Sequence, residues 1–143
     1  MNPDLDPRSA IRKELIAPCG MNCAVCMGRL LRDKNPCPGC RGEQTHKSRN
    51  CQRCVIANCE YFKKSGSLYC PEDCPKYPCK RLQALDQRYR TKYAMSMLEN
   101  LRFIQVSGIE AFVENERERW TCQVCGAITC VHRSACPICG APR

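Results

Sequence analysis

The sequence predicts a small metal-stabilised fold of helices and irregular segments. Sixteen cysteines occur in 143 residues, and most of them lie in closely spaced groups. The aromatic residues are only 3 Phe, 1 Trp and 5 Tyr, and aliphatic residues are sparse before position 80. A core of that size does not offset the conformational entropy of folding unless cross-links assist it. Cysteine at this density indicates either a disulfide scaffold or a metalloprotein.

The first residues of the chain favour the metalloprotein. Residues 1–7 are polar and acidic, contain two prolines and precede no apolar stretch, so they do not have the pattern of a signal peptide. No stretch approaches the ~20 apolar residues of a membrane-spanning helix. We therefore expect a cytoplasmic protein with no membrane partner. In that reducing compartment close-spaced Cys pairs bind metals and rarely form disulfides.

Composition divides the chain into four parts. These are an N-terminal tail (residues 1–18), a Cys-rich multi-metal domain (19–80), a helical segment (81–119) and a zinc ribbon (120–143). One helical turn is expected in the tail over 9–15. A helix is expected over 24–33, within a Cys-rich domain that otherwise consists of irregular loops and metal knuckles.

The helical segment contains no Cys, and its apolar residues recur at helical spacing. They are Leu82, Leu85, Tyr89, Tyr93, Met97, Leu101 and Ile104. Ser96 followed by Glu99 forms a capping-box pattern that predicts a helix start, and Gly108 predicts the end of that helix. A third helix is expected from Ile109 to near Trp120. Its mixed charges over 110–118 predict an exposed helix face.

The clearest metal signal lies at the C-terminal end. Cys122-x2-Cys125 is followed after ten residues by Cys136-x2-Cys139. Two such knuckles supply four thiolates to one tetrahedral zinc ion, and the closed coordination predicts a structural site. A Gly directly follows the second Cys of each pair, where a knuckle turn requires a residue that tolerates positive φ.

The residues around these knuckles allow more than one interpretation. The spacing after Trp120 is similar to that of small fingers that bind single-stranded RNA or ubiquitin, although Thr129 stands where those fingers have an asparagine. We expect Trp120 to pack on the ribbon rather than stack on a base. Cys130 and His132 lie between the knuckles and are unassigned, and for His132 we favour an ordinary loop histidine over a metal ligand.

The Cys-rich domain carries eleven further candidate ligands. They are Cys19, Cys23, Cys26, Cys37, Cys40, Cys51, Cys54, Cys59, Cys70, Cys74 and Cys79. With His46 they would fill three four-coordinate sites, whereas two sites with spare thiols would leave His46 solvated. For the whole chain we expect about three zinc ions, within a range of two to four. The spacing does not show which cysteines share an ion.

Iron is the main alternative to zinc. Cysteine thiolates also hold iron–sulfur clusters, which would make this an electron-transfer or redox-sensing protein. The spacing Cys19-x3-Cys23-x2-Cys26 is also that of radical S-adenosylmethionine enzymes. Those enzymes need a barrel of several βα units, and no strand pattern follows here.

Several motifs resemble a prokaryotic family of Cys-rich, zinc-binding proteins known as a domain of unknown function. They are the CGMNCAVC, CPGCR and CPKYPC stretches that begin at Cys19, Cys37 and Cys74, and the WTCQVC stretch that begins at Trp120. The resemblance covers nearly the whole chain after residue 18. It implies a bacterial or archaeal cytosolic protein and supplies no activity.

The charge gives weak support to a nucleic-acid partner. The formal charge is +9, but thiolates binding three zinc ions in the Cys-rich domain and one in the ribbon would lower it to about +2. Residues 27–64 nevertheless hold nine basic residues against three acidic ones. An interaction module for RNA, DNA or protein is therefore the leading hypothesis for function.

Catalytic patterns are poor by comparison. We find no Gly-rich phosphate loop, no Ser/His/Asp arrangement and no paired carboxylates at an apolar site. A thiol-based enzyme or a metal-delivery protein is a further alternative. It needs an unliganded Cys, and Cys51 and Cys130 are the candidates.

Overall fold

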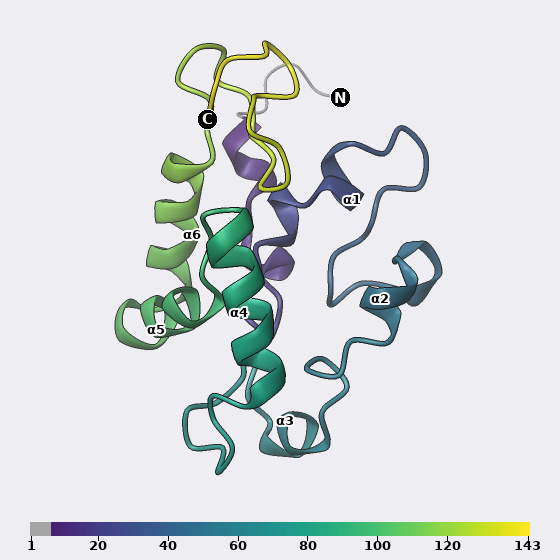
Figure 1. Ribbon diagram of the computed structural model, residues 1–143, viewed down its shortest axis with the longest axis vertical. Helices are drawn as coiled ribbons and strands as arrows, with labels where there is room; N and C mark the ends of the chain where they lie inside the picture. Colours follow the sequence, from purple (N-terminus) through teal and green to yellow (C-terminus); the bar gives the residue numbers. More distant parts are fainter. Residues whose placement is uncertain (1–6) are drawn as a thin grey trace.

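The computed structural model describes residues 7–143 and contains, in that range, six α-helices and no strands (Figure 1). The helices are α1 (Met27–Leu30), α2 (Arg49–Gln52), α3 (Glu60–Ser65), α4 (Lys80–Lys92), α5 (Met97–Ser107) and α6 (Ile109–Arg119). Short 3-10 turns are η1 (Pro7–Ala10), η2 (Lys13–Leu15), η3 (Cys23–Val25) and η4 (Gln44–His46). The prediction of a small fold of helices and irregular segments is confirmed at this level.

The three longest helices pack in chain order, α4 against α5 and α5 against α6. The Ser96 hydroxyl accepts the Glu99 N–H at 3.1 Å and so caps the start of α5. Gly108 has a φ of +90° and separates α5 from α6. The predicted start and end of α5 are therefore confirmed, as is the third helix before Trp120.

The core lies between these helices and the N-terminal segment. Ile11, Ile16 and Val25 are fully buried, and they belong to one cluster with Phe112 of α6 and Leu101 of α5. The expectation of a tail over residues 1–18 is therefore wrong at Ile11 and over 15–17, whose side chains pack into the core, while residues 12–14 between them are exposed. The first six residues of that tail lie outside the described part of the chain.

The Cys-rich part, residues 19–79, is mostly loop with short helices. In Figure 1 the α1 and α2 regions lie to the right of α4, and α3 lies near the lower end of the molecule. The helix expected over 24–33 is wrong in extent, because the chain is extended at Cys26 (φ −78°, ψ 141°). That residue separates η3 from α1, which ends at Leu30.

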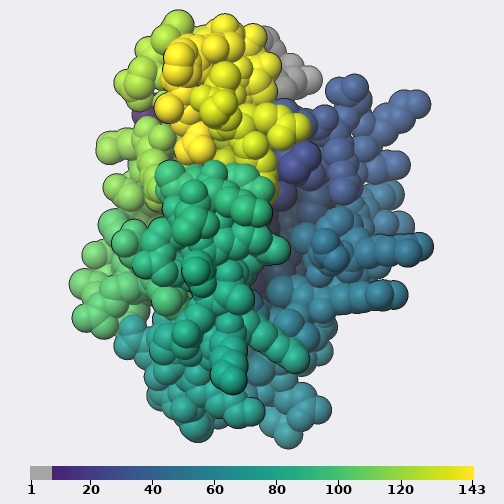
Figure 2. Space-filling view, in the orientation of Figure 1, coloured from purple at the N-terminus to yellow at the C-terminus, as the bar shows by residue number. Residues whose placement is uncertain are grey.

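The C-terminal part follows α6 and lies at the upper end of the molecule (Figures 1 and 2). It joins the N-terminal segment through the Val131 N–H, which donates to the Val25 carbonyl at 2.9 Å. No helix in residues 7–143 has the length and apolar character that a membrane crossing requires.

Candidate metal centre

Two turns of the same construction make up the C-terminal site. In the first, the Cys122 N–H donates to the Ala127 carbonyl at 2.7 Å, and the Gly126 N–H donates to the Cys122 carbonyl at 2.9 Å. The second turn repeats both bonds fourteen residues later, from Cys136 to Ala141 at 2.8 Å and from Gly140 to Cys136 at 2.9 Å. Both glycines have positive φ, +79° and +77°, as the sequence predicts.

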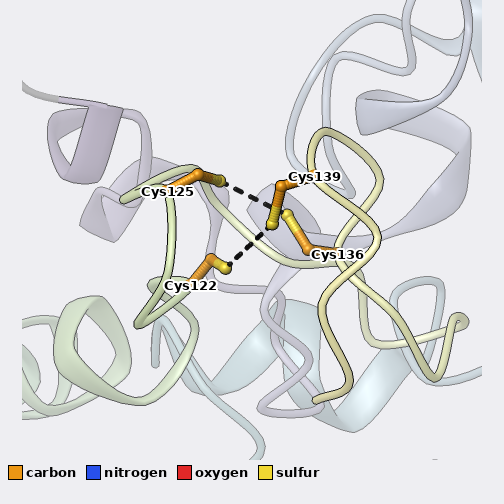
Figure 3. Close-up of side chains that lie close together, drawn as sticks. All are labelled: Cys122, Cys125, Cys136 and Cys139. Carbon is orange, nitrogen blue, oxygen red and sulfur yellow. Dashed lines mark hydrogen bonds between the residues drawn. The ribbon is translucent and has the colours of Figure 1, made fainter.

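The two turns bring their four cysteines together (Figure 3). The four Sγ atoms all lie within 4.8 Å of one another. Cys122 Sγ lies 3.6 Å from Cys139 Sγ, and Cys125 Sγ lies 3.7 Å from Cys136 Sγ. These distances exclude disulfides, whose sulfurs are about 2.05 Å apart, and all sixteen cysteines are free thiols. This cluster is compatible with metal binding.

The sulfur separations fit a single ion. Four thiolates about 2.3 Å from one tetrahedral zinc ion lie about 3.8 Å from one another, close to the 3.6 and 3.7 Å observed. In a [4Fe–4S] cluster each thiolate binds a different iron, and in a [2Fe–2S] cluster only two thiolates share an iron, so the four ligand sulfurs of a cluster are not all as close together as those that share one ion. The donor set therefore fits one thiophilic ion.

Backbone N–H groups favour the thiolate form at two of these cysteines. The N–H groups of Cys125 and Val124 point to the Cys122 sulfur and lower the pKa of that thiol to about 6. The N–H groups of Cys139 and Ile138 likewise lower the pKa of Cys136. At Cys125 the Ala127 N–H lowers the pKa, but burial and the neighbouring sulfurs outweigh it and raise the pKa to about 11. Because a metal binds the thiolate, the N–H groups at Cys122 and Cys136 favour the form that an ion requires.

Buried groups beneath the knuckles fix the ribbon to α6. Trp120 is only 1% exposed, and the guanidinium groups of Arg119 and Arg143 each lie 4.9 Å from its ring centre. The prediction that Trp120 packs on the ribbon is confirmed. The Thr129 N–H and hydroxyl both donate to the Trp120 carbonyl, at 2.7 and 2.9 Å. Thr129 therefore has a structural role.

A buried carboxylate holds Trp120 in place. Glu116 is fully buried, and its Oε2 accepts the Trp120 Nε1–H at 2.6 Å and the Asn22 Nδ2–H at 3.1 Å. The interpretation of residues 110–118 as an exposed face is thus wrong at Glu116. The sequence signal was the four-residue spacing of Phe112, Glu116 and Trp120, which places the three on one face of a helix.

His132 connects the ribbon to the rest of the molecule. Its Nδ1 accepts the Met27 N–H at 3.2 Å, so Nε2 carries the proton and donates to the Tyr89 hydroxyl at 2.9 Å. Burial, followed by the charges of Arg133 and Arg88, lowers the pKa of His132. Both ring nitrogens are therefore engaged by protein groups, and His132 is neither a solvated loop residue nor a metal ligand here.

Cys130 remains apart from the four-thiol cluster. It is fully buried, and burial raises the pKa of its thiol. A buried thiol with a raised pKa is a poor nucleophile, so this environment does not support a reactive Cys130. Cys51, the other candidate, is exposed.

The eleven cysteines of residues 19–79 are placed less closely. Within the described residues only the C-terminal four bring their ligand atoms within 4.8 Å of one another. Cys19 is buried, Cys51 and Cys59 are exposed, and the other eight are half-buried: Cys23, Cys26, Cys37, Cys40, Cys54, Cys70, Cys74 and Cys79. His46 is exposed. These residues therefore remain predicted ligands.

Basic side chains in the Cys-rich part bind main-chain carbonyls. Arg29 donates to the Cys37 carbonyl at 2.9 Å, Arg32 to that of His46 at 2.7 Å, and Lys47 to that of Cys40 at 2.5 Å. Arg41 donates to the Ile16 carbonyl at 2.9 Å and also to that of Leu68. Four of the nine basic residues in this segment therefore hold loops together.

Comparison with known proteins gives no assignment. No family model, no curated protein and no solved structure matches the chain.

Proposed function

We propose that the protein binds zinc structurally, and that one zinc ion occupies the site formed by the four C-terminal cysteines. The observation that carries this proposal is the meeting of four sulfurs, with separations of 3.6 and 3.7 Å between the two pairs. Zinc has no geometric preference of its own and suits a tetrahedral set of thiolates.

The proposed ion has a structural role because the protein supplies all four ligands. A catalytic zinc keeps one position open for water or substrate, and this donor set leaves none. The ion would join the turn that begins at Cys122 to the turn that begins at Cys136. Val124 and Ile138, at the tips of the two turns, are 75% and 74% exposed and add little packing between the turns.

Metal counting tests the zinc site. The full-length protein is compared with the Cys125→Ser/Cys139→Ser variant, which loses one ligand from each turn. We expect the variant to lose one equivalent of zinc by elemental analysis. Cys130→Ala, a change at a cysteine of the same region outside the cluster, should retain the full number. Equal zinc contents in the wild type and the double variant would overturn the proposal.

The same preparation distinguishes zinc from iron. Zinc thiolates are colourless, whereas iron–thiolate centres absorb visible light. Anaerobically purified protein is expected to be colourless and to give tetrahedral, thiolate-rich Co²⁺ spectra after cobalt exchange. A brown protein with iron in place of zinc would support the electron-transfer alternative.

We further propose that the folded protein is an interaction module for a protein partner. Two observations favour protein over nucleic acid. The aliphatic side chains of Val124 and Ile138 project into solvent from the paired turns, and several basic residues of the Cys-rich part are engaged by carbonyls. Val124 and Ile138 occupy the same position in two turns whose sulfurs meet, so their exposed side chains offer apolar surface for a protein contact.

Anisotropy of a labelled single-stranded RNA tests the choice of partner. Phosphate binding by several cations would give an affinity that falls steeply with salt. We expect no saturable binding by the zinc-loaded protein even at low salt. Tight, salt-sensitive binding would show that the basic residues of 27–64 form a nucleic-acid surface, and it would overturn the proposal of a protein partner.

A further inference from the structure

The chain turns sharply between Cys19 and Cys23. The Ala17 N–H donates to the Met21 carbonyl at 2.8 Å, and the Gly20 N–H donates to the Ala17 carbonyl at 2.9 Å. Gly20 has a φ of +91°, a conformation that side-chain-bearing residues rarely adopt. The turn therefore holds the two cysteines at its ends in a fixed relation.

A second loop packs directly on Cys23. A Cβ atom added to Gly39 would lie 2.8 Å from Leu15 Cδ2 and 3.8 Å from Cys23 Cβ. Gly39 also has a φ of +95°. The next residue, Cys40, directs its N–H to the Cys23 sulfur. The absence of a side chain at Gly39 thus allows Cys40 to reach the first pair of cysteines.

Cys54 is the fourth cysteine near Cys19, Cys23 and Cys40. Burial raises the pKa of the Cys19 thiol, and the nearby thiols of Cys40 and Cys54 raise it further. Burial also raises the pKa of Cys23, to which Cys19 and Cys40 add, and that of Cys40, to which Cys54 adds. Cys19 belongs to the hydrophobic core, and the other three pack against it. Four cysteines from three loops therefore lie on the inner side of the Cys-rich part, with their sulfurs farther apart than the 4.8 Å of the C-terminal cluster, and a bound ion would draw them together.

A different set of cysteines lies beside this one. A Cβ on Gly28 would lie 3.8 Å from Cys26 Sγ and 3.6 Å from Cys37 Cβ, and Cys51 and Cys37 are electrostatic neighbours of Cys26. The two sets adjoin, since after burial Cys26 also raises the pKa of Cys23, and Cys51 that of Cys40. Along the chain, the cysteines of the second set (Cys26, Cys37 and Cys51) are therefore interleaved with those of the first.

A buried cation accompanies the first set. Lys47 is only 8% exposed, and its ammonium donates to the Cys40 carbonyl at 2.5 Å. No carboxylate pairs with Lys47 among the ion pairs of residues 7–143. A buried ammonium is costly unless a negative charge lies near it. Four thiolates and one divalent ion carry a net charge of −2, which would supply that partner.

We propose that Cys19, Cys23, Cys40 and Cys54 form a second, buried four-thiolate metal site, and that Lys47 neutralises part of its charge. The site takes a thiophilic divalent cation, with zinc the natural occupant. Binding releases the four thiol protons, and the four sulfurs become the ligands of the ion. This site does not depend on the proposed zinc centre at the C-terminus.

Alkylation during stepwise zinc removal tests the grouping on the wild-type protein. Zinc-loaded protein is mixed with a chelator and N-ethylmaleimide, and the labelling of each cysteine is followed by peptide mass spectrometry. We expect these four thiols to become reactive with one common rate constant. The C-terminal four should follow a rate of their own, which keeps the two proposals separable. A common rate for Cys19, Cys23 and Cys26, with Cys54 different, would overturn the grouping.

Substitution of Lys47 tests the charge. Lys47→Met keeps the length of the side chain and removes its charge, and Lys34→Met makes the same change at an exposed lysine. Loss of a group that supports the metal ligands without binding the ion typically weakens metal binding about 10- to 100-fold. Zinc release from the site of Cys19, Cys23, Cys40 and Cys54 should therefore be faster by about that factor in Lys47→Met. Lys47→Arg should restore slow release. Rates equal to wild type in Lys47→Met would refute the role of Lys47, and failure of Lys47→Arg to restore the rate would reduce that role to packing.

Discussion

Replacement of Glu116 by Ala should strongly destabilise the protein. The substitution removes the acceptor for two buried donors, Trp120 Nε1–H at 2.6 Å and Asn22 Nδ2–H at 3.1 Å. A hydrogen bond to a charged group contributes about 1.5–3 kcal/mol, and a buried donor left without a partner costs about 1–3 kcal/mol. Since these terms overlap, we expect a loss of about 4 kcal/mol in the free energy of unfolding.

Thermal unfolding followed by circular dichroism measures this loss, with zinc held in excess for every variant. A loss of about 4 kcal/mol corresponds to a fall of roughly 10–15 °C in Tm for a chain of this size. Glu118→Ala makes the same change at an exposed position of the same helix and should leave Tm within about 2 °C. Glu116→Gln keeps one oxygen acceptor and should fall between the two. A Tm for Glu116→Ala equal to that of Glu118→Ala would refute the assigned role of the carboxylate.

Three further predictions concern other parts of the molecule. Gly20→Ala should lower stability by more than about 2 kcal/mol, because φ is +91° and the new Cβ would lie 2.9 Å from the Met97 carbonyl oxygen; an unchanged urea midpoint would contradict this. In Asp86, burial raises the pKa, but the hydrogen bonds from Ser96, Leu98 and Arg90 outweigh it and leave the pKa lowered. The stability difference between wild type and Asp86→Ala should therefore be complete above pH about 4 and should shrink as pH falls through the lowered pKa; a difference that stays constant down to pH 3 would count against it. A strong chelator should make residues 27–64 sensitive to protease while α4 to α6 keep helical signal, and full resistance would show that metal does not hold this part together.

The C-terminal cluster and the helix boundaries follow from local sequence patterns. Each Cys-x2-Cys pair is followed by Gly, so six consecutive residues specify each turn. The ribbon contains only these two pairs, so the sequence leaves one way to combine them into a four-cysteine site. Ser96 and Gly108 likewise set the start and the end of α5, the helix that they flank. These features were predictable because the interactions that form them lie close together in the chain.

Long-range features were not predictable in this way. The burial of Ile11 depends on α6, and that of Glu116 depends on Asn22, which lies 94 residues away. The proposed site joins Cys19 and Cys23 to Cys40 and Cys54, which come from later loops, and not to the nearby Cys26, a choice that local spacing does not specify. Zinc as the metal, the partner class and the family resemblance of the Cys motifs stay predictions.

The contact between Val25 and Val131 has a consequence for biosynthesis. The N-terminal segment is synthesised first, but Glu116, Trp120 and Val131, which complete its surroundings, come about ninety or more residues later in the chain. On the ribosome, residues 11–25 therefore emerge with their apolar side chains uncovered and stay so until residues 116–131 have been synthesised. A nascent chain interrupted before residue 116 would leave that apolar segment without the α6 and C-terminal residues that cover it.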